Sequence, residues 1–295
     1  MSDTGEFALW PPRSVIYGTD FSESSERAGQ FAQLLARQFG AELTVVHAFT
    51  LSQSAMEMEI GQGAKSAQRK DLEGALAAVA RRFGEGVQRV SPVLIEGVPQ
   101  ERIPQLAGEN APGIIVLGTR GRGRLGRGLI GSAADGILRS TNGPSLTVGP
   151  HVPDLAAGTA PIKKVFYATD LSPVAALGGA YAAGIAVGFG ASLDALHVVR
   201  AADLNDPERL DRIRKEFCKA LESASPGFAA RIAERKQWIE EGSAHARILD
   251  HVRDHQVDLL VLSVRKSSNL WLRERLSGAF DIIANAPCPV MTITG

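Results

Sequence analysis

The sequence Tyr17-Gly18-Thr19-Asp20-Phe21-Ser22 returns 150 positions later as Tyr167-Ala168-Thr169-Asp170-Leu171-Ser172. The same offset places Phe39-Gly40-Ala41-Glu42-Leu43 onto Phe189-Gly190-Ala191-Ser192-Leu193. Agreement at two separate places with one offset is typical of a duplicated structural unit. The chain is therefore predicted to contain two copies of one fold.

The repeat divides the 295 residues into two parts of nearly equal size. Later in the chain the offset shortens to 145, so that Ile115-Val116-Leu117 corresponds to Leu260-Val261-Leu262. The segment 149–161, which contains proline, glycine and alanine, is typical of a linker. We therefore predict one domain at residues 1–150 and a second at residues 151–295, each close to a common domain length.

Short apolar runs alternate with segments of helical periodicity in each repeat. The first run is too short for a helix and suits a buried strand. Ser22 and Ser172 are favourable N-caps for the helices that follow, Pro173 suits the first helical position, and Gly40 can end the first helix in a left-handed conformation. The alternation predicts, in each domain, a five-stranded parallel sheet with helices on both faces. In the first repeat the predicted strands are 14–17, 43–48, 90–95, 113–117 and 145–148, and the later helices lie at 72–83, 100–107 and 132–139.

The overall composition excludes several classes of protein. The 32 basic residues balance 32 acidic ones, which argues against binding to nucleic acid or to a membrane through bulk charge. Cys218 and Cys288 lack the paired spacing of zinc sites or disulfide frameworks. The sequence has no apolar stretch long enough for a spanning helix and no signal peptide, so we expect a cytoplasmic protein.

The segment Gly118-Thr-Arg-Gly-Arg-Gly-Arg-Leu-Gly-Arg-Gly-Leu-Ile-Gly-Ser132 carries the clearest functional signal. Glycines let backbone N–H groups approach phosphate oxygens, and four arginines, with Arg120 the first, can offset phosphate charge. Ser132, as N-cap with Asp135 three residues later, marks a helix start that favours an anion. Asp20 follows the first strand, where a carboxylate can accept from ribose hydroxyls. A nucleotide is the simplest ligand with all these properties.

The glycine spacing resembles the ATP-binding signature of the universal stress protein family. It matches that signature at Gly118, Gly121, Gly131 and Ser132. The Thr19-Asp20-Phe21-Ser22 start also resembles the family, and the resemblance covers both repeats. It implies a Rossmann-like fold similar to that of the adenine-nucleotide alpha hydrolases, a role in the stress response, and ATP, with or without Mg²⁺, as the ligand.

The resemblance also assigns positions around the nucleotide. It implies that Gly18, Thr19 and Asp20 border the adenosine and that Ala48 lies near adenine. The segment from Gly118 to Ser132, which includes Arg120, Gly121 and Gly131, would surround the triphosphate, and Leu117 and Ala133 would flank the same site.

The second repeat lacks most of this signature. Ser263, Lys266 and Leu276 stand where the first repeat has Gly118, Gly121 and Gly131. Side chains at these positions would obstruct the approach of backbone amides to phosphate. We therefore expect a degenerate second domain, although Gly278, one position late, leaves weak binding by a shifted loop open.

Several alternatives remain open at the level of sequence. The glycine and arginine segment can also be a solvated surface loop or a short RNA-binding segment. His47 and His197 each end an apolar strand and are interpreted as core or rim histidines. For Asp170 we favour a helix-entry role over contact with a ligand.

The predicted function is a nucleotide-dependent signalling module for protein partners still to be identified, with no catalytic residue and at most weak ATPase activity. A slow ATP hydrolase or phosphotransferase, in which Asp20 is the only clear carboxylate, is one alternative. A nucleotide-free structural tandem is another. The family resemblance also implies pairing through the final strand. Pairing of 145–148 with 290–293 would make the chain an internal pseudo-dimer, and a homodimer stays open as well.

Overall fold

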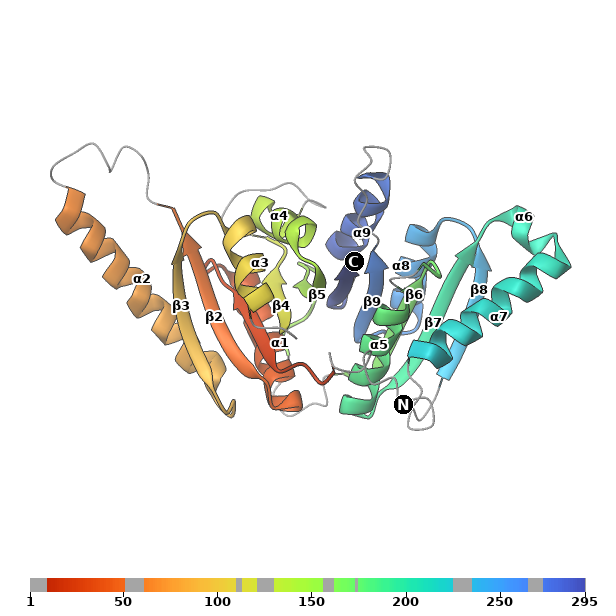
Figure 1. Ribbon diagram of the computed structural model, residues 1–295, viewed down its shortest axis with the longest axis horizontal. Coiled ribbons are helices and arrows are strands. Elements are labelled where there is room, and N and C mark those ends of the chain that lie inside the picture. Colours follow the sequence, from red (N-terminus) through yellow and green to blue (C-terminus); the bar gives the residue numbers. More distant parts are fainter. Residues whose placement is uncertain are drawn as a thin grey trace, which may run out of the picture. The chain divides into compact units, whose positions relative to one another are not determined.

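The computed structural model describes residues 10–50, 61–109, 113–120, 130–155, 162–172, 175–224, 235–264 and 273–294. These residues form two compact units (Figure 1). The first unit contains the described residues up to Arg120 together with Gly131–Thr141, and the second contains Ile130 and the described residues from Asn142 onwards.

The first unit is built on parallel strands in the order β3-β2-β1-β4. Helices α1 and α2 pack on one face of these strands, and α3 and α4 pack on the other. The chain passes from β1 to β2 on one side and later returns to β4 on the other side of β1, so the strand order reverses at β1. The elements are β1 (Ser14–Gly18), α1 (Glu23–Phe39), β2 (Glu42–Phe49), α2 (Gly61–Gly84), β3 (Val90–Glu96), α3 (Pro99–Glu109), β4 (Gly113–Gly118) and α4 (Ser132–Ser140).

The predicted elements of this unit are confirmed, most with small differences at their ends, but α2 begins at Gly61, eleven residues before the predicted start at residue 72. Each of the four strands extends one or two residues beyond its prediction. Ser22 is the N-cap of α1, since its side chain accepts a hydrogen bond from the Ser25 N–H. Gly40 ends the helix with φ 64°, and its N–H donates to the carbonyl oxygen of Ala36. These local signals succeed because each acts between residues only a few positions apart.

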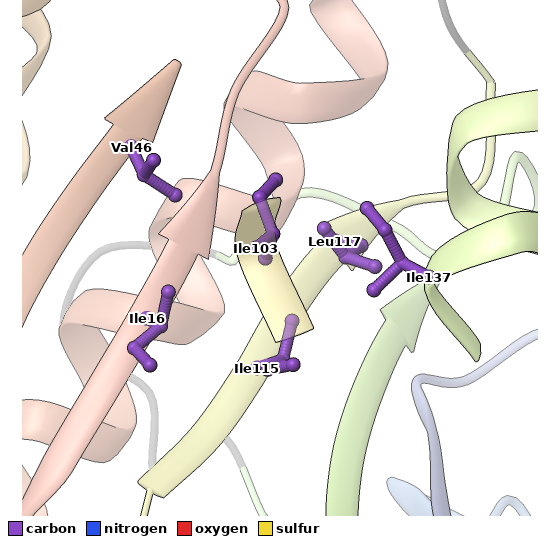
Figure 2. Close-up of a cluster of buried hydrophobic side chains, with 6 residues drawn as sticks. All are labelled: Ile16, Val46, Ile103, Ile115, Leu117 and Ile137. Carbon is purple, nitrogen blue, oxygen red and sulfur yellow. The ribbon is translucent and has the colours of Figure 1, made fainter. Parts of the chain in front are cut away.

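An apolar cluster fills the space between the strands and the helices α3 and α4 (Figure 2). It joins strand residues with one residue from each helix. On the opposite face the ring of Tyr17 packs edge-on against Phe83 of α2, with the ring centroids 5.6 Å apart. The two faces of β1 are thus both covered, as expected for a parallel sheet. The cluster consists of Ile16, Val46, Ile103, Ile115, Leu117 and Ile137.

The second unit repeats this pattern. Its strands lie in the order β5-β10-β9-β6-β7-β8, and the five strands from β10 to β8 run parallel. Helices α5 and α7 pack together on one face, and α8 and α9 pack together on the other. The elements are β5 (Gly143–Val148), β6 (Lys164–Thr169), α5 (Ala175–Phe189), β7 (Ser192–Val199), α6 (Ala201–Leu204), α7 (Pro207–Ala224), β8 (Arg235–Glu241), α8 (Ala244–Asp254), β9 (Leu259–Val264), α9 (Arg273–Asn285) and β10 (Val290–Thr294).

Strand β5 closes the first sequence repeat but belongs by its contacts to the second unit. It pairs antiparallel with β10, with Ser145 opposite Thr292 and Thr147 opposite Val290. The predicted pairing of 145–148 with 290–293 is therefore confirmed. The hydroxyl of Thr147 also donates to the carbonyl oxygen of Val290 at 3.0 Å.

The fold class is the predicted one, a duplicated α/β architecture with mainly parallel strands covered by helices on both faces. The expected start of the fifth helix at Pro173 lies outside the described residues, and α5 is described from Ala175. Among the helices of the described ranges, none combines the length and apolar character needed to cross a bilayer.

Candidate nucleotide site

The turn after β1 is held by hydrogen bonds of the backbone and side chain of Thr19. The buried Thr19 donates its N–H to the carbonyl oxygen of Val46 at 2.9 Å, which ties the turn to β2. Its Oγ1 accepts the N–H of Phe21 at 3.0 Å and lies 3.0 Å from the hydroxyl oxygen of Ser25. The hydroxyl group of Thr19 is therefore engaged inside the protein.

Asp20 shapes the entry to α1. Its Oδ1 accepts the N–H of Ser22 at 3.1 Å and the hydroxyl of the same residue at 2.5 Å. Phe21, between them, has φ 62°, a left-handed conformation that non-glycine residues seldom adopt. In the second unit Asp170 Oδ1 accepts the Ser172 N–H at 2.9 Å, and Leu171 has φ 56°. The motif is thus a helix-entry structure in both repeats, as expected for Asp170.

Gly118 ends β4 against the first turn of α1. A Cβ atom on Gly118 would stand 2.6 Å from the carbonyl oxygen and 2.7 Å from the hydroxyl oxygen of Ser24. The N–H of Arg120 donates to that Ser24 hydroxyl at 3.2 Å, and its carbonyl oxygen accepts from Ser22 Oγ at 3.4 Å. The start of the glycine and arginine segment is therefore anchored to the N-terminal end of α1.

The far end of the same segment returns to this place. The N–H of Gly131 donates to the carbonyl oxygen of Thr119 at 2.7 Å, so the two ends of the segment are bonded to each other. Residues 121–129, which include Gly121 and three of the four arginines, lie outside the described residues. The described parts place the N-terminus of α4 beside the carboxyl end of β4, where an anion can be bound.

The N-cap of α4 differs from the prediction. The prediction that Ser132 caps this helix is wrong, because Ser132 is the first helical residue and Gly131 is the cap. Gly131 has extended backbone angles, and its carbonyl oxygen accepts the Asp135 N–H at 2.9 Å. The cap residue supplies no side-chain hydrogen bond. The first turn of α4 thus begins without the side-chain oxygen that would compete with an anion for its amides.

Arg120 is the arginine of segment 118–132 that lies within the described residues, and it gives this part of the site a positive charge. Its side chain is half-buried, and its Nε is buried without a hydrogen-bond partner. A buried donor of this kind is costly until an acceptor reaches it. Arg120 therefore fits a site for an anionic group.

The remaining predicted site residues lie around this centre. Gly18 ends β1, and a Cβ on it would stand 2.6 Å from the Leu117 side chain, which belongs to the apolar cluster. Ala48 lies on β2 next to His47, and Ala133 is exposed in the first turn of α4. The structure therefore brings the ends of β1 and β4 and the start of α4 together, while the Leu117 side chain faces the core.

Two serines that follow β1, Ser22 and Ser24, contact Arg120 but were not predicted to be site residues. Ser22 and Ser24 bond the Arg120 carbonyl and N–H groups. The run of Ser22, Ser24 and Ser25 after β1 was the only available signal, because the partners are 96 to 98 positions away in the sequence.

His47 and His197 each lie within hydrogen-bond distance of a backbone carbonyl oxygen. His47 Nδ1 lies 2.7 Å from the carbonyl oxygen of Thr19, and its ring packs on Phe21 with centroids 4.5 Å apart. His197 makes the corresponding contact with the Thr169 carbonyl oxygen at 2.9 Å. Within the described ranges, no group of three or more His, Cys, Asp or Glu residues is arranged to hold a metal ion.

The second repeat has a serine at the position of Gly118 and a glycine on the helix that packs against it. Ser263 stands there, and its hydroxyl occupies space beside Gly178, where a Cβ would lie 2.0 Å from Ser263 Oγ. Residue 28, the counterpart of Gly178 in the first repeat, is a buried alanine. One repeat thus has glycine on the strand and alanine on the helix, and the other has serine on the strand and glycine on the helix.

Comparison with known proteins places both repeats in one family. The model of the universal stress protein family matches residues 12–149 and again residues 161–294. A universal stress protein of Thermus aquaticus is 32% identical over 142 residues, which cover 46% of this chain and 98% of the relative. Universal stress protein MJ0531 of Methanocaldococcus jannaschii is 28% identical over 138 residues, covering 46% of this chain and 81% of the relative.

A solved structure shares the fold over almost the whole chain. The crystal structure of a universal stress protein from Archaeoglobus fulgidus covers 97% of this chain and 99% of its own, with a TM-score of 0.75 and 19% identity. The family match extends over both repeats and therefore over most of the sequence. The chain belongs to the universal stress protein family and contains two copies of its domain.

Proposed function

We propose that the first repeat binds ATP at the carboxyl ends of β1 and β4, and that the nucleotide controls a surface read by protein partners. The observation that carries this proposal is that the two ends of the glycine and arginine segment, residues 118–132, are hydrogen-bonded to each other and to α1. The Gly131 N–H bonds the Thr119 carbonyl at 2.7 Å, and Ser24 Oγ accepts the Arg120 N–H at 3.2 Å. A triphosphate bound there would meet the amides of α4 and the Arg120 side chain.

The residues present fit this ligand. The N-terminus of α4 favours negative charge through its dipole and its unpaired first-turn amides. Arg120 Nε is a buried donor without a partner. ATP would supply the acceptor oxygens, with Mg²⁺ bound by the phosphates. Asp20 is bonded to Ser22 in the entry to α1, and we assign it a positioning role in this site.

A signalling role follows from how the segment is attached. Both of its ends are bonded to described parts of the first unit, so a ligand held between them would change the surface that protein partners contact there. We place this role in the stress response and in the cytoplasm, on the basis of the family resemblance and the sequence.

The test is nucleotide content of the purified protein after denaturation, followed by ATP titration in a calorimeter. Substitution of Gly118 is a poor probe, since any Cβ there meets Ser24. Ala133→Glu is a better one, because an acid in the first turn of a helix favours folding but repels phosphate. Ala133→Gln has nearly the same size without the charge.

We expect about one ATP per chain for the wild type and for Ala133→Gln. We expect affinity at least about tenfold lower for Ala133→Glu, which corresponds to about 1.4 kcal/mol of repulsion. Equal ATP affinity of Ala133→Glu and Ala133→Gln would show that the triphosphate does not bind beside α4. Absence of ATP binding by the wild type would reject the proposal.

A further inference from the structure

The second unit contains a cavity of about 600 Å³ at the carboxyl ends of β6, β7 and β9. Its size lies within the range of sites for small ligands. Helices from both faces of the strands contribute to it, α7 from one face and α8 and α9 from the other. Aliphatic side chains form much of its wall: Leu196, Ile213, Ile248, Leu262 and Ile282.

The corresponding place in the first unit is packed differently. There Ile103 and Ile137 join the apolar cluster, and the Gln100 side chain lies over Gly136, where a Cβ would stand 2.1 Å from Gln100 Cγ. In the second repeat His245 and Asp281 occupy the positions of Gln100 and Gly136. The second repeat therefore lacks the glycine against which the Gln100 side chain packs in the first repeat. Ile248 and Ile282, the counterparts of Ile103 and Ile137, line the cavity.

The described wall of the cavity has no excess of positive charge for a polyphosphate. The charged residues among its described lining are two arginines and two aspartates, and Arg209 and Asp203 form an ion pair with each other. The segment 118–132 of the first repeat contains four arginines and no acid, whereas its counterpart 263–277 contains four basic residues and one acid, so the positive charge is smaller in the second repeat. Ser263 also places a side chain where the first repeat has Gly118. The four charged residues are Asp170, Arg200, Asp203 and Arg209.

One polar atom in the wall lacks a partner. His245 lines the cavity, and its Nε2 is buried without a hydrogen-bond partner. A neutral imidazole nitrogen needs either a donor or an acceptor, according to its tautomer. A ligand with one polar group beside an apolar body would satisfy this atom and cover the aliphatic wall.

We propose that this cavity binds an uncharged, mostly apolar small molecule that hydrogen-bonds His245, and that it does not bind a nucleoside triphosphate. The two repeats would then have separate ligands, although they share one fold. This proposal does not depend on ATP binding by the first repeat.

The probe is N-phenyl-1-naphthylamine, an uncharged aromatic amine whose fluorescence rises in apolar sites. The full chain is titrated with it, with and without ATP. Gly278→Phe is the decisive variant, because Gly278 lines the cavity and an added Cβ there meets no described atom within 4 Å. Gly108→Phe in α3 is the matched control, since its Cβ is equally free. Both changes replace a helical glycine and should be tolerated.

We expect Gly278→Phe to weaken probe binding at least about tenfold and Gly108→Phe to leave it unchanged. His245→Leu should weaken it by a smaller factor, about threefold to tenfold, through loss of one hydrogen bond. ATP affinity should be the same in all three variants, which separates this proposal from the previous one.

Methyl NMR of isoleucine locates the probe within the protein. We expect the probe to shift the signals of Ile213, Ile248 and Ile282, which line the cavity, and ATP to leave them in place. Equal probe affinity of wild type and Gly278→Phe would overturn the proposal. Displacement of the probe by ATP together with shifts of these three methyl groups would overturn it as well.

Discussion

The α-carbon of Gly118 lies so close to Ser24 that a Cβ atom on residue 118 would stand 2.6 Å from the Ser24 carbonyl oxygen. From the sequence, Gly118 is expected to give phosphate access to the backbone. The packing of β4 against the first turn of α1 requires glycine in addition, whether or not a nucleotide is bound. The proposed ATP site and the stability of the first unit therefore share this residue.

Gly118→Ala is expected to destabilise the first unit even without nucleotide. The new Cβ meets backbone atoms of Ser24, which cannot rotate away, so the ends of β4 and α1 must separate. We expect a loss of about 1–3 kcal/mol, measured by urea unfolding of nucleotide-free protein. Gly108→Ala, where the Cβ meets nothing, serves as the control and should be neutral or slightly stabilising. Unchanged stability of Gly118→Ala would contradict the packing role.

Gly178 and Ser263 are expected to be energetically coupled. Gly178→Ala places a Cβ 2.0 Å from Ser263 Oγ and should cost about 1–3 kcal/mol of unfolding free energy. Ser263→Gly removes the obstructing hydroxyl and reproduces the alanine and glycine arrangement of the first repeat. A double-mutant cycle should therefore give a favourable coupling of about 1 kcal/mol or more. Additive effects of the two changes would show that the exchange between repeats has no energetic basis.

Gly40 and Gly190 provide a matched measurement of backbone strain in the two units. Both have left-handed backbones, with φ 64° and 65°, and an added Cβ meets no described atom within 4 Å at either residue. Gly40→Ala and Gly190→Ala should each cost about 1 kcal/mol through conformation alone. Asparagine, which tolerates this conformation better, should restore part of the loss. Urea unfolding measures both, and a cost at only one site would contradict a purely local cause.

Alkaline pH is expected to destabilise both units through their tyrosines. Burial raises the pKa values of Tyr17, Tyr167 and Tyr181 from 10.0 to about 12. These are the three tyrosines of the chain. Because the folded pKa lies above the unfolded one, the stabilisation is complete below pH 10 and is lost as the pH rises towards 12.

The second unit contains two of these tyrosines and should lose stability more steeply than the first. Each tyrosine contributes a slope of up to about 1.4 kcal/mol per pH unit. Tyrosinate absorbance, recorded with circular dichroism, should show ionisation only together with unfolding. Tyr17→Phe should reduce the slope in the first unit. Ionisation of the native protein near pH 10 would show that the rings are accessible to solvent.

The sequence by itself determined the duplication, the order of the elements and the ends of several of them. Ser22 as the N-cap of α1 and Gly40 as its end were both predicted, because capping acts between residues one turn apart. The pairing of 145–148 with 290–293 was implied by the resemblance to the family, and the structure confirms it. Family membership was likewise predicted from the spacing of the glycines.

Only the tertiary structure decided what the individual residues do. Ser132 was expected to cap α4, but Gly131 takes this place, where its N–H also bonds Thr119. The contact of Gly118 with Ser24 and the exchange of Gly178 with Ser263 join residues far apart in the chain. The cavity of the second unit depends on side chains from several strands and helices at once. Local patterns report neighbours within a few positions, whereas these features depend on the distance between segments, which is set by the packing of the whole unit.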